Sequence, residues 1–122
     1  MTLPPPALIA PLRAAALALP EVVEATHFHD APSFLLRRAC FALWQPDAGE
    51  KDGGRAIMRL DRGLQMIRFE ARPEVFAPAR VATVHWSYVR LSATEPGEIE
   101  TLVREAWASL APLYLRRQAG LA

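Results

Sequence analysis

Residues 19–44 read LPEVVEATHFHDAPSFLLRRACFALW, and the second half of this stretch decides the fold. Two apolar, β-prone runs flank Arg37, Arg38 and Ala39, a pattern that is typical of a hairpin with a short turn. We therefore expect an antiparallel strand pair at this point of the chain. The polar run DAGEKDGG, residues 47–54, is expected to form a loop after it.

Two further strands are predicted beyond that loop. In RAIMRL, residues 55–60, alternation places Ala56, Met58 and Leu60 on a face turned to the core and the other three residues on a solvent-exposed face. The run VATVHWSYVRL, residues 81–91, is rich in β-branched and aromatic residues and alternates in the same way. Each run therefore predicts a strand with one face turned to the core.

Three helices are predicted from apolar residues at helical spacing. The first spans residues 8–19, where Pro11 must open or kink the helix and Pro20 ends it. The second runs from Asp61, as the capping residue, to Arg72. Its buried side is expected to consist of Leu60, Leu64, Ile67 and Ala71. The third is expected to be capped by Thr94 and to bury the stripe Ile99, Leu102, Val103, Ala106, Trp107 and Leu110.

Together these elements predict an α+β fold. We expect a single two-layer domain in which an antiparallel sheet is packed against N- and C-terminal helices and one short internal helix. The chain has 122 residues, of which 52% are apolar, and this suffices for one core. One domain is therefore expected over residues 1–122, with residues 1–6 either frayed or in the first turn of a helix.

Six short pieces of the sequence are informative because of their order. They are LALPEVVEATHFHDAPSF (17–34), FALW (41–44), RLD (59–61), RPEVFAPA (72–79), WSYVRL (86–91) and VREAWASLAPLYL (103–115). Each is a weak motif alone, but in this order they span nearly the whole chain and closely resemble the bacterial MmcQ/YjbR family. The resemblance implies a small α/β domain described as CyaY-like or double-wing, and DNA binding as the family's label. It implies no catalytic activity, cofactor or metal site.

The chain departs from this family in two places. Where the family has an Arg-Gly-Lys-like turn, Arg38 replaces the glycine and would be strained at positive φ, and Ala39 replaces the lysine. In ARVATVHW, residues 79–86, the glycines that the family tends to have beside its tryptophan are missing. The family's local turn and any role of its tryptophan are therefore not carried over to Trp86.

The candidate binding residues lie in the basic middle of the chain. The net charge is only +1 and the pI is near 8.0, but residues 37–90 contain ten basic and six acidic side chains. The candidates are Arg37, Arg38, Arg55, Arg59, Arg62, Trp86, Tyr88 and Arg90. On a sheet face, such residues can neutralise phosphates and stack on bases.

A solvated sheet face is the alternative interpretation of the same residues. Its arginine stems would cover apolar surface and its charged groups would pair with Asp61, Glu70 and Glu74. The low net charge favours this interpretation, because a nucleic-acid-binding domain usually has a pI above about 9. The family resemblance makes nucleic-acid binding less disfavoured relative to the solvated face, but the solvated face remains the favoured interpretation.

Other residues that could support chemistry are interpreted as structural. His27, His29, Asp30 and Cys40 can bind metals, but a structural zinc site needs four ligands and a catalytic site usually three, and this set has no standard spacing. Cys40 lies in an apolar strand, where the reactivity of a thiol falls. Because no P-loop, GxSxG or dinucleotide motif is present, we expect no enzyme activity, no cofactor and no metal.

Composition also suggests a location and leaves two functions open. A single cysteine fits a reducing compartment, and no signal peptide or long apolar run is apparent, so we expect a soluble cytoplasmic protein without a membrane partner. The first function is DNA binding by arginines of the sheet face and hairpin. The second is a non-catalytic module for a protein or a small acidic ligand, bound in a cleft between the sheet and the terminal helix. A pocket lined by Trp86, Tyr88 and one or two arginines would favour this second function. The sequence indicates no oligomeric state.

Overall fold

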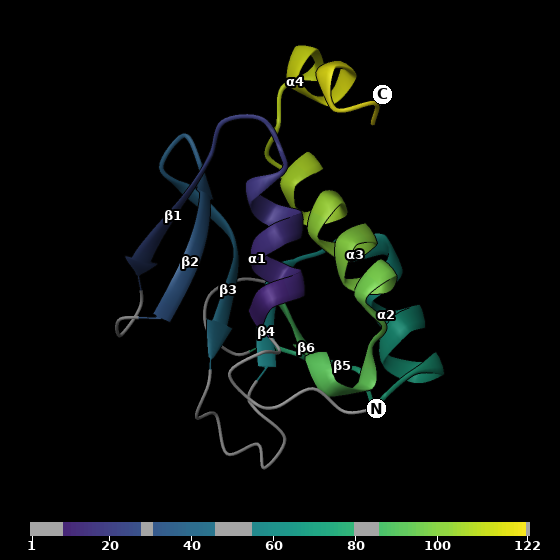
Figure 1. The fold of residues 1–122 in the computed structure, drawn as a ribbon. Helices are drawn as coiled ribbons and strands as arrows, with labels where there is room; N and C mark the ends of the chain where they lie inside the picture. The colour runs from purple at the N-terminus through teal and green to yellow at the C-terminus, as the bar shows by residue number, and fades with distance from the viewer. Residues whose placement is uncertain (1–8, 28–30, 46–54, 80–85, 122) are drawn as a thin grey trace.

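The computed structural model describes residues 9–27, 31–45, 55–79 and 86–121 (Figure 1). Its elements in chain order are α1 (Ile9–Leu17), β1 (Val22–His27), β2 (Ala31–Leu36), β3 (Ala39–Gln45), β4 (Arg55–Arg59), α2 (Arg62–Ala71), β5 (Phe76–Pro78), β6 (Trp86–Arg90), η2 (Leu91–Ala93), α3 (Pro96–Ala108) and α4 (Leu113–Gln118). The predicted loop at residues 47–54 lies outside these ranges. No helix within them is both long enough and apolar enough to cross a membrane.

The described strands form one antiparallel sheet with the order β1-β2-β3-β4-β6-β5. The first four strands follow the chain, and β6 then lies between β4 and β5. Figure 1 shows α1, α2 and α3 gathered on one side of this sheet. The predicted α+β arrangement, with terminal helices and a short internal helix against an antiparallel sheet, is therefore confirmed.

The predicted hairpin is formed by β2 and β3. Its turn consists of Arg37 and Arg38, whose φ angles are 51° and 72°. Both lie in the left-handed region, which a two-residue turn needs in order to match the twist of the strands, and which costs a residue with a side chain about 1–2 kcal/mol. Arg37 donates hydrogen bonds to Glu21 Oε1 at 3.2 Å and to the Tyr114 hydroxyl. The strain predicted at Arg38 is therefore present, and Arg37 shares it.

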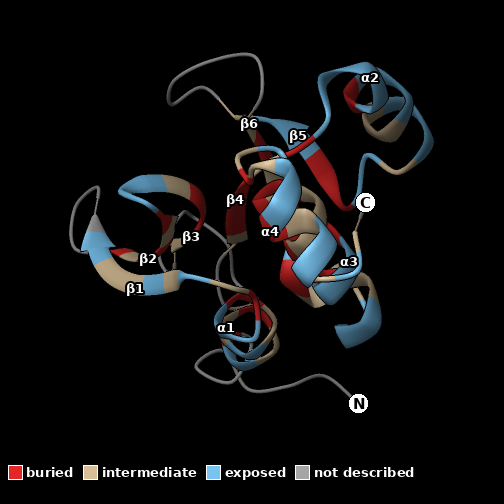
Figure 2. Ribbon diagram, turned by 90° about the horizontal axis from the view of Figure 1, so that it is seen from above, coloured by how far each residue is buried: buried red, intermediate tan, exposed pale blue. Residues whose placement is uncertain are grey.

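The hydrophobic core lies between the sheet and the helices α1 and α3. Figure 2 shows the buried segments of these elements facing one another. Trp107, on the predicted stripe of α3, is fully buried, and its Nε1 donates a hydrogen bond to the carbonyl of Pro20 at 3.2 Å. This bond joins α3 to the turn that follows α1, so one side chain fills the core and fixes the first connection. Leu110, also predicted on the stripe, is only partly buried.

The predicted cap of α3 was wrong. The helix begins at Pro96 after Glu95, whose side chain does not bond to the first N–H groups. Thr94 Oγ1 donates instead to the carbonyl of Leu91 at 2.8 Å. Because Thr94 closes the 3₁₀ turn after β6, the α-helix starts two residues later, where the fixed φ of Pro96 suits a first helical position.

α2 has the predicted cap but buries the opposite face. Asp61 Oδ1 accepts a hydrogen bond from the Leu64 N–H at 3.1 Å, as predicted. Leu64 and Ile67 were predicted to be buried, but they are 43% and 62% exposed. Gln65 is buried in their place, and its Nε2 donates to Ser87 Oγ on β6 at 2.9 Å.

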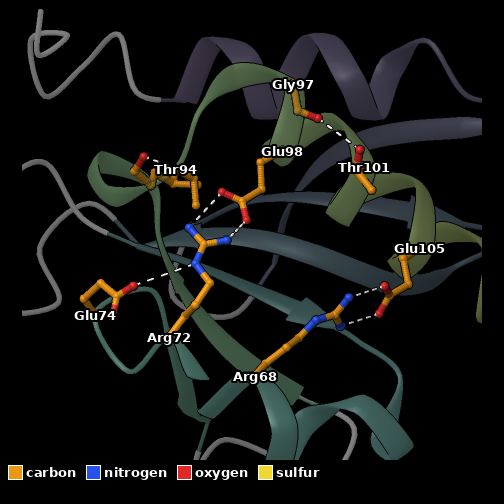
Figure 3. Close-up of polar contacts among 9 residues, drawn as sticks. Arg68, Arg72, Glu74, Thr94, Gly97, Glu98, Thr101 and Glu105 are labelled. Carbon is orange, nitrogen blue, oxygen red and sulfur yellow. Dashed lines mark hydrogen bonds and ion pairs between the residues drawn. The ribbon is translucent and has the colours of Figure 1, made fainter. Parts of the chain in front are cut away.

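Charged contacts with α3 explain the reversed orientation of α2 (Figure 3). Arg68 donates two hydrogen bonds to Glu105, at 2.6 and 2.7 Å, and Arg72 donates two to Glu98. Burial opposes the ionisation of Glu105, but the bonds from Arg68 and from the Asp61 N–H hold its pKa below the usual value. The acidic side of α3 thus selects the basic side of α2, and Leu64, Met66 and Ile67 are left on the outside.

Candidate functional site

The open face of the sheet, opposite the helices, carries five of the predicted binding residues. In β4, Ala56 and Met58 enter the core, so the residues between and beside them point to the opposite face. The register with β6 then places Arg55 opposite Arg90, Ile57 opposite Tyr88 and Arg59 opposite Trp86. We call Arg55, Arg59, Trp86, Tyr88 and Arg90 the open-face set.

An apolar layer lies beneath the open-face set. Leu43 and Ile57 are 3% and 1% exposed, and the partly buried Trp86 and Tyr88 pack against them. The prediction that Ile57 lies on a solvent-exposed face was therefore wrong. The reason is that aromatic side chains from the neighbouring strand cover it, so the two rings stabilise the sheet as well as forming part of its surface.

Arg55 is held above the ring of Tyr88. Its guanidinium carbon lies 3.5 Å from the ring centroid, and its Nε donates to Gln45 Oε1 at 3.2 Å. The ring attracts the cation through its negative face, and Gln45 is within reach because it lies opposite Arg55 in the register of β3 with β4. The sequence did not identify Gln45 as a site residue, since only the register brings it to this position.

Arg59 contributes a buried polar atom to the same face. Its Nε is buried and has no hydrogen-bond partner among the described residues. Leaving a buried donor without an acceptor costs about 1–3 kcal/mol.

No acidic side chain of the described strands lies on the open face. Within the described strands, the single acid is Glu24 of β1, and it points toward α1. Arg13 donates to both of its oxygens, at 2.8 and 3.0 Å. The other described acids lie in helices and turns. Positive charge on the open-face set is therefore not offset by acids of the same strands.

A small cavity of about 60 Å³ lies at the margin of the open-face set. Arg55, Tyr88 and Arg90 line it together with residues 73–77, which include Glu74. Its volume suffices for a few water molecules or one small anion. Glu74 was predicted to pair with the candidate arginines. It forms a salt bridge with Arg72, which is not one of these candidates, and its Oε1 lies 3.7 Å from the Arg72 Nε.

The remaining predicted cations are placed elsewhere. Arg62 is the first residue of α2, in the helix layer, and it does not share the open face. Arg37 and Arg38 form the β2–β3 turn, where Arg37 is directed to Glu21 and Tyr114. The structure thus divides the predicted set into an open-face group, a turn and one helix residue.

The predicted cleft between the sheet and the terminal helix is not formed by Trp86 and Tyr88. Both residues lie on the face away from the helices, because their register partners alternate with the core residues of β4. A groove of about 380 Å³ instead runs between α1 and α3, lined mainly by alanine, proline and glycine with Glu100 and Arg104. The cleft prediction was therefore wrong in its position. Of the predicted lining, Tyr88 and two arginines border the small cavity at the margin of the open-face set instead.

The metal-capable residues give no described cluster. Within the described ranges, no group of three or more such side chains is close enough to hold a metal ion. His29, Asp30 and the side chain of His27 lie outside what is described. Burial raises the pKa of the Cys40 thiol, whose Sγ donates to the carbonyl of Ala42 at 3.4 Å. This environment makes Cys40 a weak nucleophile.

Comparisons with known proteins agree with this architecture. The crystal structure of Deinococcus radiodurans protein DR2400, described with the domain DUF419, superposes with a TM-score of 0.71 at 22% sequence identity, over 91% of this chain and 86% of that chain. No curated protein matches the chain. The family model YjbR matches residues 17–109, which is more than half of the sequence. The chain therefore belongs to the YjbR family.

Proposed function

We propose that the open face of β4 and β6 binds single-stranded nucleic acid, without a catalytic step. The observation that carries the proposal is the composition of the open-face set, in which three arginines flank two aromatic rings on adjacent strands that carry no acid. Arginines neutralise phosphates, and aromatic rings give bases a surface for stacking. The proposal is thus a more specific form of the DNA binding that the family resemblance suggests.

The shape of the face favours a single strand over a duplex. Strands lie about 4.8 Å apart, so a six-stranded sheet is more than 20 Å wide, whereas the major groove of B-DNA is about 12 Å wide. The sheet face therefore cannot enter the groove. An unpaired strand, in contrast, can lie across β4 and β6 with its bases on the rings.

Each member of the set has a distinct part in such a complex. Arg55, already stacked on Tyr88, extends that ring with a planar cation on which a base can stack. Arg59 is partly exposed and lies opposite Trp86, so its guanidinium can donate to a phosphate oxygen. Arg90 is exposed at the margin and can contact the next phosphate.

Fluorescence anisotropy with a labelled oligo-dT of about ten nucleotides tests the proposal. At low salt we expect binding whose affinity falls with salt, with a slope near −2 in log K against log salt for about three phosphate contacts at roughly −0.7 each. Arg55→Ala and Arg90→Ala should each weaken binding about three- to tenfold and make the slope shallower by about 0.7.

Arg117→Ala is the matched control, because it removes the same charge from the exposed side of α4. We expect it to leave affinity and slope nearly unchanged. If no binding occurs at about 20 mM salt, or if Arg117→Ala is as damaging as Arg90→Ala, the open face is not the binding surface.

A small acidic ligand is the second candidate. The cavity lined by Arg55, Tyr88 and Arg90 favours it, since these two arginines outnumber the one acid of the lining, Glu74, around a space that fits one small anion. Thermal unfolding with inorganic phosphate and with a dicarboxylate checks this possibility. A rise in melting temperature that Arg90→Ala abolishes, without any binding of oligo-dT, would favour the small ligand.

A further inference from the structure

α2 turns the apolar side of an amphipathic helix to solvent. Met66, Ile67 and Leu64 are 64%, 62% and 43% exposed, whereas Gln65 on the opposite side is buried. Figure 2 shows α2 at the periphery of the molecule, pale blue over much of its length. A group of large apolar side chains exposed on one short helix is typical of an interaction surface, since a helix normally buries such a stripe.

The exposed side of α2 is built from two neighbouring rows. Residues four apart stack along a helix, so Arg62, Met66 and Glu70 form one row, and Gly63 and Ile67 begin the adjacent one. Arg62 is at the N-terminal end and Glu70 near the C-terminal end, and both are exposed. The surface is therefore apolar at its centre, with a cation at one end and an anion at the other.

The two charges oppose the dipole of their own helix. A helix is positive at its N-terminus and negative at its C-terminus, so Arg62 and Glu70 are each at the less favourable end. Neither forms a salt bridge or hydrogen bond with another described side chain. An antiparallel helix laid against α2 would reverse this situation, because each charge would meet a helix end of the opposite sign.

We propose that α2 is the contact surface of a symmetric dimer of this chain. In a two-fold, antiparallel arrangement with Met66 near the axis, Arg62 meets Glu70 of the partner subunit and Glu70 meets Arg62 of the partner subunit. Gly63 lets the two helices approach closely, and Ile67 fills the space beside the axis. A second copy satisfies both charged ends with a single surface, which is the requirement of an isologous contact.

The expected dimer is weak. One face of a ten-residue helix buries much less than the roughly 1,600 Å² of a standard interface, so we expect a dissociation constant on the order of 10⁻⁴ M. The contact lies in the helix layer, so both open faces remain uncovered. It is therefore independent of the proposed nucleic-acid binding.

Analytical ultracentrifugation of the full chain, freed of nucleic acid, tests the proposal between about 10 μM and 1 mM. The mean mass of the wild type should rise toward that of a dimer. R62E and E70R should each weaken association at least about tenfold, because each places two pairs of like charges across the contact. An equimolar mixture of R62E and E70R should associate again, since only their heterodimer has both pairs of opposite charges.

Two further variants complete the experiment. Ile67→Asp should abolish association, and Glu100→Arg, a charge reversal at an exposed site of α3, should leave it unchanged. Circular dichroism confirms that each variant is folded, which is expected because the changed side chains are exposed. A wild type that stays monomeric at 1 mM, or a mixture that associates no better than its components, would overturn the proposed dimer.

Discussion

Ile57 and Met58 are neighbours on β4, and both are almost fully buried, but different parts of the molecule bury them. Met58 lies in the core between the sheet and the helices. Ile57 is covered on the open face by Trp86 and Tyr88, which come from the adjacent strand of the same sheet. The comparison shows that one face of the sheet is closed by tertiary packing and the other by a single layer of side chains.

The first prediction compares alanine substitutions at these two positions. Met58→Ala should lower the free energy of unfolding by about 3–5 kcal/mol, because the cavity it leaves is enclosed by helices and sheet. Ile57→Ala should cost about 2 kcal/mol, since the layer above it can collapse or admit water. Urea unfolding followed by circular dichroism measures both values.

Conservative replacements serve as controls for this pair. Met58→Leu and Ile57→Val keep most of the volume, and each should cost no more than about 1.5 kcal/mol. Equal costs for the two alanine variants would mean that the aromatic layer packs as tightly as the helices, and the distinction between the faces would then fail.

The helix side of the sheet is also stabilised by a partly buried ion pair between Glu105 and Arg68. On the helix side, Glu105 is bonded to Arg68 and to the Asp61 N–H, and its side chain is 25% exposed. Glu105→Gln should lower the free energy of unfolding at pH 7 by about 1.5–3 kcal/mol, because it leaves the Arg68 guanidinium partly buried without its counter-charge. Chemical denaturation at a series of pH values measures this cost.

The direction of the pH dependence follows from the lowered pKa of Glu105. A carboxyl whose pKa is lower in the folded state stabilises the fold above its unfolded pKa, near 4.3, and loses that effect as the pH falls through the folded value. The difference between wild type and Glu105→Gln should thus be constant above about pH 5 and shrink below pH 4. Glu100→Gln, at an exposed site of the same helix, should change stability by less than about 0.5 kcal/mol.

Local patterns in the sequence were sufficient to predict those features of the fold that depend only on neighbouring residues. The two runs around Arg37 and Arg38 predicted the hairpin, and the stripe through Trp107 predicted the buried side of α3. Asp61 predicted the start of α2, because a cap depends only on residues within one turn. Such features need no knowledge of distant contacts.

The orientation of α2 and the composition of the open face depend on distant contacts. Leu64 and Ile67 have the spacing of a buried stripe, but the salt bridge from Arg68 to Glu105, 37 residues away, turns that stripe outward. In the same way, Gln45 reaches Arg55 only through strand register. Spacing indicates which residues share a side of an element, but not which side the rest of the protein covers.

The smallest expected loss of stability is that caused by substituting Arg55 on the open face. Arg55 contacts Tyr88 and Gln45, and it forms no salt bridge with a described acid. Arg55→Ala should lower the free energy of unfolding by only about 0.5–1 kcal/mol, the usual value of a cation–π contact near the surface. The same variant should weaken oligo-dT binding severalfold, whereas Glu105→Gln should weaken stability and leave binding unchanged. If Arg55→Ala instead costs as much stability as Glu105→Gln, the arginine serves to hold the sheet together, and its position on the open face would no longer support a role in binding.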